Sequence, residues 1–88
     1  MRFEWDEDKA RSNLAKHRVD FQSARFVFDD PFALLVFDRI VDGEERWHLI
    51  GSTPDHRLYV EDRNDPTIRI ISARKADPRE RRAYELGR

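Results

Sequence analysis

Positive charge gathers directly after an apolar run near the end of the chain. The stretch RIISARKADPRERRAYE passes from Ile70 and Ile71 to Arg74 and Lys75, and four further arginines follow before the chain ends. A guanidinium group can form two parallel hydrogen bonds with a carboxylate or a phosphate, which an ammonium group cannot do. These residues therefore predict a binding site for the phosphates of a nucleic acid or for acidic groups of a protein.

A second group of candidates lies on two segments that are typical of strands. Because alternate side chains of a strand face the same side, Arg46 and His48 share one face of ERWHLIG. In TIRIISAR, strict alternation predicts two faces, namely Ile68, Ile70, Ser72 and Arg74 on one and Arg69, Ile71 and Ala73 on the other. We expect Arg46, His48 and Arg74 to converge around a groove at one end of the sheet.

Each of these candidates also has a structural interpretation. Arginines on the faces of sheets often pair with carboxylates, which here are those of Glu44 and Glu45. Lys16 and His17 end the predicted first helix. A histidine there can transfer protons near neutral pH, but cations at this end also complement the helix dipole. The residues alone leave both interpretations open.

The chain offers no recognisable sequence motif for a metal ion. It lacks cysteine, and His17, His48 and His56 show no i, i+4 spacing, so the common zinc motifs are absent. Its three glycines are scattered singly, which excludes a glycine-rich phosphate loop, and no serine lies in a nucleophile elbow. We therefore expect neither a metal ion nor another cofactor.

The composition fits one small domain that spans residues 1–88. Hydrophobic residues make up 39% and aromatic residues 11% of the chain, which favours a folded protein although 40% of the residues are charged. No apolar run is long enough to span a membrane and no signal-peptide pattern opens the sequence, so we expect a cytoplasmic protein.

The net charge of −1 hides an asymmetry along the chain. From Arg69 onward, seven basic residues accompany three acidic ones, whereas residues 1–68 carry a net charge of −5. The C-terminal segment is therefore the part of the chain best suited to an anionic partner.

The elements that position these residues begin with a short strand over RFEW, residues 2–5. Asp6 is placed to cap a first helix that runs to about Lys16. Asp20 is placed to cap a second helix, on which Phe21, Ala24 and Phe28 form an apolar stripe that ends before the sequence DDP.

Four strands follow, over residues 32–38, 45–51, 57–62 and 67–74. Predicted turns separate them at Asp42-Gly43, at TPDH (residues 53–56) and at RNDP (residues 63–66). Asp77, Pro78 and Glu80 then open a terminal helix as a capping box, and this helix runs to about Leu86. The predicted fold is α+β, with a short N-terminal strand, two helices, a four-stranded antiparallel sheet and a C-terminal helix.

Several short motifs, in this order and spacing, resemble the BrnT family of bacterial toxins. They are W-D near the start, N-x-x-K-H ending the first helix, D-F opening the second, E-R in the second long strand, S-A-R ending the last strand and E-R-x-x-Y in the final helix. The matching positions are Trp5, Asp6, Asn13, Lys16, His17, Phe21, Glu45, Arg46, Gly51, Ser72, Arg74, Glu80, Arg81 and Tyr84. The chain departs from the family where Arg18 replaces a glycine and where the third long strand is short. With Arg18, either the left-handed helix end is strained or the helix ends differently.

The resemblance implies a compact RelE-like fold, RNA cleavage without a cofactor and a BrnA-like, DNA-binding antitoxin as partner. In such a reaction the ribose 2′-hydroxyl attacks its own phosphate, and Arg46 and Arg74 would stabilise the charge that develops there. Lys16 and His17 would assist as charge stabiliser and proton-transfer group, with His48 as an alternative base. Glu45 would orient an arginine. RNA would also contact Lys75, Arg79, Arg82 and Tyr84 of the C-terminal segment.

Two other classes of function remain open. The chain can be a non-catalytic binding module whose basic C-terminal segment docks an acidic partner protein. It can also be a DNA-binding factor, although no helix-turn-helix pattern is present. Growth arrest that depends on Arg46 and Arg74 when the chain is expressed alone would favour the ribonuclease.

Overall fold

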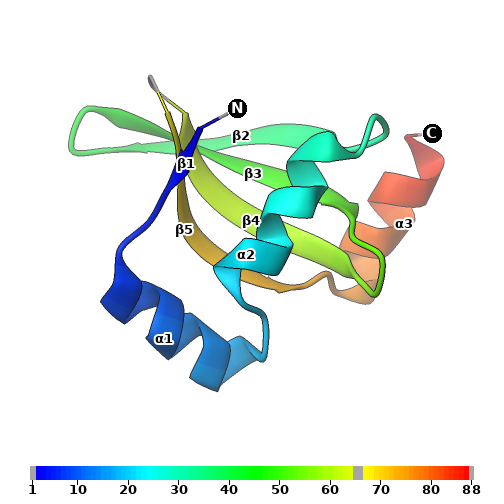
Figure 1. The fold of residues 1–88 in the computed structure, drawn as a ribbon. Helices are drawn as coiled ribbons and strands as arrows, with labels where there is room; N and C mark the ends of the chain where they lie inside the picture. Colours follow the sequence, from blue (N-terminus) through cyan, green and yellow to red (C-terminus); the bar gives the residue numbers. More distant parts are fainter. Residues whose placement is uncertain (1, 65–66, 88) are drawn as a thin grey trace.

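One mixed β-sheet with helices on both faces makes up the fold, in a computed structural model that describes residues 2–64 and 67–87 (Figure 1). In chain order the elements are β1 (Phe3–Glu4), α1 (Glu7–His17), α2 (Phe21–Ala24), the 3-10 helix η1 (Arg25–Asp29), β2 (Leu34–Val41), β3 (Glu44–Ser52), β4 (Arg57–Asn64), β5 (Ile68–Lys75) and α3 (Pro78–Leu86). Within the described ranges, no helix is long and apolar enough to cross a membrane.

The sheet has the strand order β1-β5-β4-β3-β2. Its four long strands are antiparallel neighbours, which confirms the predicted α+β class and the predicted run of four strands. The short first strand, however, pairs in parallel with β5 through Phe3 opposite Ile68. The sheet is therefore five-stranded and mixed rather than purely antiparallel, and its RelE-like character stays a prediction.

The main core lies between the sheet and the helices α1 and α2 (Figure 1). Its buried members are Val19, Phe21, Ala24, Val27, Leu49, Leu58, Val60, Ile70 and Ala73. Gly51 permits the close approach of η1, because a Cβ atom there would lie 2.7 Å from the side chain of Val27. On the opposite face α3 packs through Tyr84 and its preceding Ala76 against Ile50.

The predicted helix starts are confirmed at all three capping residues. Asp6 accepts a hydrogen bond from the backbone N–H of Lys9 (3.1 Å), and Asp20 accepts one from that of Ser23 (2.7 Å). At the start of α3, Asp77 and Glu80 each accept a backbone N–H of the other, at 2.8 and 2.9 Å, which completes the capping box. The sequence rules for helix N-termini therefore hold for α1, α2 and α3.

The second helix differs from its prediction because it tightens after one α-helical turn. From Arg25 to Asp29 the chain is a 3-10 helix, which has three residues per turn. Phe21, Ala24 and Val27 thus align on the buried side, while Phe28 is only partly buried. Phe28, the last position of the predicted stripe, still packs against the edge of the core.

Arg18 ends α1 in the left-handed conformation, with φ 60° and ψ 29°, which is the first of the two alternatives that the sequence left open. A side chain in this conformation is strained by its Cβ atom. We expect Arg18→Gly to raise the free energy of unfolding by up to about 1 kcal/mol, measured by urea denaturation. The matched Ala15→Gly in the exposed interior of α1 should lower it by a similar amount. Equal destabilisation by both changes would contradict this account.

A register shift in β5 changes which side chains face which side. Glu61 on β4 pairs with Ser72, whereas the next residue, Asp62, pairs with Ile70, so Ile71 has no partner across the ladder. One extra residue reverses the alternation beyond it. Ile70 and Ala73 consequently both lie in the core, and Arg74 lies on the opposite face from Ile70. The prediction that Arg74 and Ile70 share a face is wrong.

The outermost strand, β2, exposes an unusual amount of apolar surface. Leu35, Val36, Phe37 and Ile40 are exposed to between 43% and 65%. Because β2 has only β3 as a neighbour, the backbone groups on its outer edge also have no strand partner. The strand ends at the predicted tight turn, where Asp42 and Gly43 both have positive φ. The turn predicted at residues 63–66 lies partly outside the described residues, since 65 and 66 are not described.

Candidate active site

The face of the sheet that carries α3 also carries Arg46, His48 and Arg74. Arg46 and His48 alternate along β3, while β5 brings Arg74 opposite Tyr59 of the intervening strand β4. Glu61 of β4 lies opposite His48. The predicted convergence of Arg46, His48 and Arg74 on one face is therefore present, with two residues of β4 between them.

Tyr59 connects the histidine to the arginine of β5. Its hydroxyl lies 3.2 Å from Nε2 of His48, and the two rings are 4.4 Å apart at their centroids. The guanidinium carbon of Arg74 lies 4.1 Å from the centroid of the Tyr59 ring, a distance at which the cation is attracted to the ring face. Tyr59 thereby fixes the relative positions of a proton-transfer group and a cation.

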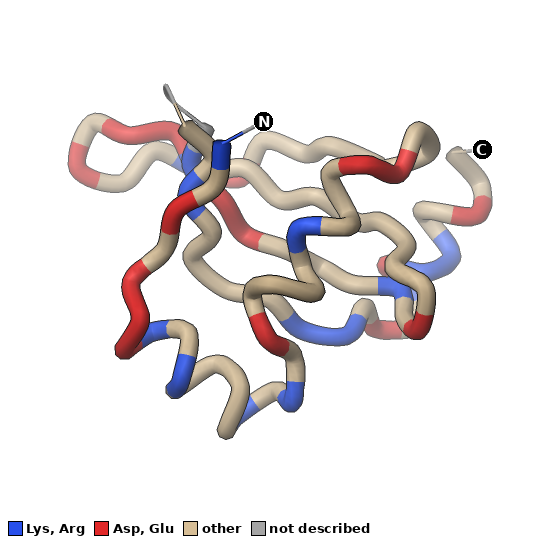
Figure 2. Tube along the Cα trace, viewed as in Figure 1, with Lys and Arg blue, Asp and Glu red and all other residues tan. Residues whose placement is uncertain are grey.

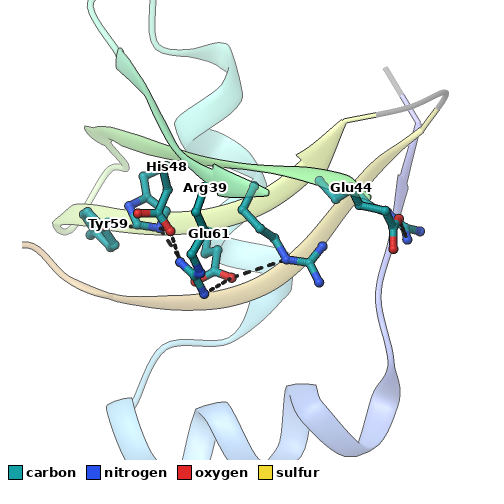
Figure 3. A network of polar contacts seen from close by, with 8 residues as sticks. Arg39, Glu44, His48, Tyr59 and Glu61 are labelled. Atoms are coloured by element: carbon teal, nitrogen blue, oxygen red, sulfur yellow. Dashed lines mark hydrogen bonds and ion pairs between the residues drawn. The ribbon is translucent and has the colours of Figure 1, made fainter. Parts of the chain in front are cut away.

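Glu61 is the carboxylate at the centre of the site (Figure 3). It lies 3.9 Å from Nε of Arg46, 3.8 Å from Nη2 of Arg39 and 3.7 Å from Nε2 of His48. Asp38 pairs with Arg39 and lies 3.5 Å from the same histidine nitrogen. The separation between Glu61 and Arg46 exceeds a good hydrogen-bond length, so the donors of Arg46 stay available to an anion.

Arg74 is held by the first turn of α3. Its two terminal nitrogens donate to the two carboxylate oxygens of Glu80 at 2.7 and 2.8 Å. The hydrogen bonds that Arg74 donates to Glu80 raise the pKa of Arg74, although burial acts against them. Burial alone would raise the pKa of Glu80, but Arg74 and the backbone of Asp77 outweigh it and lower that pKa. The same glutamate thus caps the helix and orients the arginine.

His48 is partly buried, and its surroundings favour the neutral imidazole. Burial is the largest cause that lowers its pKa, and the positive charges of Arg39 and Arg74 act in the same direction. Glu61 raises the pKa but does not outweigh them. At neutral pH His48 is therefore mostly uncharged and able to accept a proton.

Lys16 and His17 lie elsewhere, in a shallow groove between α1 and β5 that also includes Lys9 and Ser72. The hydrogen bonds and ion pairs of the described residues do not join either side chain to Arg46, His48 or Arg74. The structure thus separates these two candidates from the group on β3 and β5.

The candidates of the C-terminal segment divide into two kinds. Lys75, Arg79 and Arg82 are exposed, and Arg79 lines a shallow groove of about 330 Å³ between α3 and the strands β2 and β3. Tyr84, which we expected at the rim, is only 3% exposed. Its hydroxyl donates to Asp30 at 2.6 Å, so it is positioned for packing rather than for contact with RNA.

Glu44 and Glu45 do not hold the site arginines. Glu45 accepts a hydrogen bond from the indole N–H of Trp47 at 3.1 Å, and Glu44 pairs with Arg63. The carboxylates near Arg46 and Arg74 are instead Glu61 and Glu80. The expectation that Glu45 orients an arginine has no support in the contacts of this residue.

Sequence reasoning missed four members of the site, which are Asp38, Arg39, Tyr59 and Glu61. A signal for two of them was present in RLYVED, where Leu58 and Val60 alternate with Tyr59 and Glu61. This alternation predicts that Tyr59 and Glu61 face away from the core. Their pairing with His48 and Arg74 depends on the register between strands, which the sequence does not show directly.

The site is not suited to a metal ion. The carboxylates of Asp38 and Glu61 already face the guanidinium groups of Arg39 and Arg46. Among residues 2–64 and 67–87, no group of three or more His, Cys, Asp and Glu side chains could hold a metal ion. The residues present therefore favour chemistry carried by arginine, histidine and glutamate.

The fold and the site together define a small α+β protein that carries Arg46, Arg74 and a mostly neutral His48 on one face of its sheet. The chain belongs to the BrnT family: the family described as the ribonuclease toxin, BrnT, of type II toxin-antitoxin systems matches residues 5–80. The protein is thus a ribonuclease toxin, a class whose partners are an antitoxin and RNA. No curated protein matches the chain.

Proposed function

We propose that this toxin is an endoribonuclease that cleaves RNA without a metal ion, through attack of a ribose 2′-hydroxyl on the adjacent phosphate. It acts in the cytoplasm, where RNA cleavage inhibits translation and growth, and a BrnA-like DNA-binding antitoxin neutralises it. The observation that carries the proposal is the gathering of Arg46, His48, Glu61 and Arg74 on one face of the sheet.

Arg46 and Arg74 have the role of stabilising charge on the phosphate. Attack by the 2′-oxygen places extra negative charge on the phosphate oxygens, and fixed cations lower the energy of that state. Glu80 keeps the guanidinium group of Arg74 in place through two hydrogen bonds, while Glu61 attracts that of Arg46 from 3.9 Å, before the substrate binds. Such preorganisation avoids reorienting the cations during the reaction.

His48 has the role of the base. Its neutral imidazole accepts the proton of the 2′-hydroxyl while the new bond to phosphorus forms and the bond to the departing 5′-oxygen breaks. The departing oxygen takes up a proton from solvent, and His48 later returns its own proton to solvent, which leaves a cyclic phosphate and a 5′-hydroxyl. The imidazolium that results lies 3.5 and 3.7 Å from Asp38 and Glu61, whose charges stabilise it.

Incubation of the purified toxin with naked RNA in the presence of a chelator tests this proposal directly. We expect fragments that end in cyclic phosphate, because no step of the mechanism uses a metal ion. Expression of the chain alone should arrest growth of a bacterial host. Intact RNA together with harmless expression would contradict the proposal and would favour a non-catalytic binding module.

The pH dependence of cleavage should reflect the lowered pKa of His48. Its pKa lies below the ordinary value of 6.5, so the imidazole stays neutral to lower pH than a free histidine does. We expect kcat/KM, which reports groups of the free enzyme, to decline on the acid side only below about pH 6.5. Initial rates at constant ionic strength measure this profile, and His48→Gln should remove the decline together with most of the activity. A decline already centred above pH 7 would contradict the role of His48.

A further inference from the structure

The groove between α1 and β5 is positively charged without any acidic side chain in its lining. It has a volume of about 230 Å³. Its lining consists of Lys9, Ser12, Asn13, Lys16, His17, Ile71 and Ser72. The segment 1–68 is acidic as a whole, so a patch of this composition there needs a specific explanation.

The groove is held in shape by Asn13. Its amide nitrogen donates to the carbonyl oxygens of Ala73 (2.8 Å) and Val19 (2.9 Å), and its amide oxygen accepts the backbone N–H of Ala73 (3.1 Å). Asn13 is buried, so these bonds are shielded from water and fix α1 against β5. Lys9 and Lys16 are two helical turns apart and therefore lie on the same side of α1.

The two lysines of this groove have no salt-bridge partner. Within the described ranges, the side chains of Lys9 and Lys16 form no ion pair and no hydrogen bond. Arg11, on the same helix, pairs with Asp8, and most arginines of the sheet pair with a carboxylate. Figure 2 shows how the basic residues recur along α1. Unpaired cations in a preformed groove are available to an anion from outside the protein.

Ser72 lies between the groove and the candidate active site. This residue lines the groove, and on the sheet it lies opposite Glu61, the partner of Arg46. The short strand β1 pairs with β5 only at Ile68 and Arg69. Among the described strands, none pairs with the outer edge of β5 between these residues and Arg74, and this edge faces α1. An RNA strand bound at Arg46 and Arg74 can therefore continue over β5 into the groove.

We infer that the groove between α1 and β5 is a second phosphate-binding subsite, which holds the RNA backbone on one side of the bond to be cleaved. The inference rests on the proposed function and deepens it. Lys9 and Lys16 each bind a phosphate of the RNA backbone and thereby position the strand, and Ser12 and Ser72 supply hydroxyl donors at the edge of the groove. Lys16 and His17 act on binding rather than on the chemical step.

Binding of an oligoribonucleotide that cannot react, because every 2′-hydroxyl is methylated, tests the subsite. The double variant Lys9→Ala/Lys16→Ala should bind it about tenfold more weakly at low salt. The plot of log affinity against log salt concentration should become shallower by about 1.4, the value for two lost contacts to a single strand. Arg11→Ala, which removes an already paired cation from the same helix, is the matched control and should behave as the wild type.

Inorganic phosphate is the second probe, because it offers the same chemistry without a nucleic acid. A second oligonucleotide should displace the bound methylated probe much better than free phosphate does, at equal phosphate concentration and ionic strength. Equal competition would show a site for free phosphate and would overturn the inference, as would unchanged oligonucleotide binding by the double variant.

Cleavage of a long RNA separates this inference from the proposed function. The double variant should raise KM about tenfold and change kcat much less, because the lost contacts are made equally in the bound and the transition state. An equal loss in kcat would indicate a catalytic role for Lys16 and overturn the inference. If the wild type bound the methylated probe through Lys9 and Lys16 but cleaved no RNA, the proposed function would fail while the subsite stood.

Discussion

Replacing Arg46 or Arg74 with alanine is expected to lower the rate of RNA cleavage by about 10² to 10³-fold. Each change removes a fixed cation from the face on which the phosphate is proposed to bind, and the loss is felt chiefly in the transition state. Initial rates with a defined oligoribonucleotide measure the effect. Expression of either variant alone should no longer arrest growth.

Arg63→Ala provides a matched control for both changes. Arg63 is also a half-buried arginine of this face, but it pairs with Glu44 and Glu4 rather than with Glu61 or Glu80. We expect its variant to cleave RNA at nearly the wild-type rate. Circular dichroism should show that all three variants are folded. Full activity of the folded Arg46 and Arg74 variants would contradict the mechanism.

Asp62 should make the stability of the toxin fall as the pH rises from about 4 to about 7. It is 2% exposed, its Oδ1 has no hydrogen-bond partner among the described residues, and burial raises its pKa to about 7. In the unfolded chain this carboxyl ionises near its ordinary pKa of 3.8. Between these values the unfolded state has lost the proton that the folded state keeps, so rising pH favours unfolding, by a total on the order of 3 kcal/mol.

Urea denaturation of Asp62→Asn and of the wild type at several pH values measures this effect. The variant carries no ionisable group at this position, so its advantage over the wild type should grow between about pH 4 and pH 7 and then stay constant. Asp55→Asn, in the exposed turn before β4, is the control and should show no such trend. A difference between Asp62→Asn and the wild type that does not change with pH would contradict the account.

Those parts of the fold that depend on neighbours in the sequence could be predicted. The capping residues Asp6, Asp20 and Asp77 and the turn at Asp42-Gly43 follow from local rules. The extra residue at Ile71 did not follow, because an irregular ladder is decided by packing between distant strands. The parallel pairing of β1 with β5 likewise joins segments more than sixty residues apart.

The candidate site likewise consists of residues that could be predicted from the sequence and of partners that depend on the tertiary structure. Arg46, His48 and Arg74 could be named from residue type, and the structure places them on one face, although the strict alternation predicted in TIRIISAR is wrong. Their partners Glu61 and Glu80 could not be assigned, because nearer acids such as Glu45 offered equally good pairs in the sequence. The location of Lys16 and His17 depends on where Asn13 anchors α1, which only the tertiary structure shows.

The apolar outer strand β2 has a practical consequence for any cell or laboratory that makes this toxin by itself. Leu35, Phe37 and Ile40 meet water along an edge whose backbone groups can pair with any extended chain that arrives. In a concentrated sample the chains most often met by this edge are other copies of the toxin. Aggregation should therefore limit the concentration at which the toxin can be handled. The activity and stability of the toxin should therefore be measured in dilute solution, or after co-expression with a protein that covers β2.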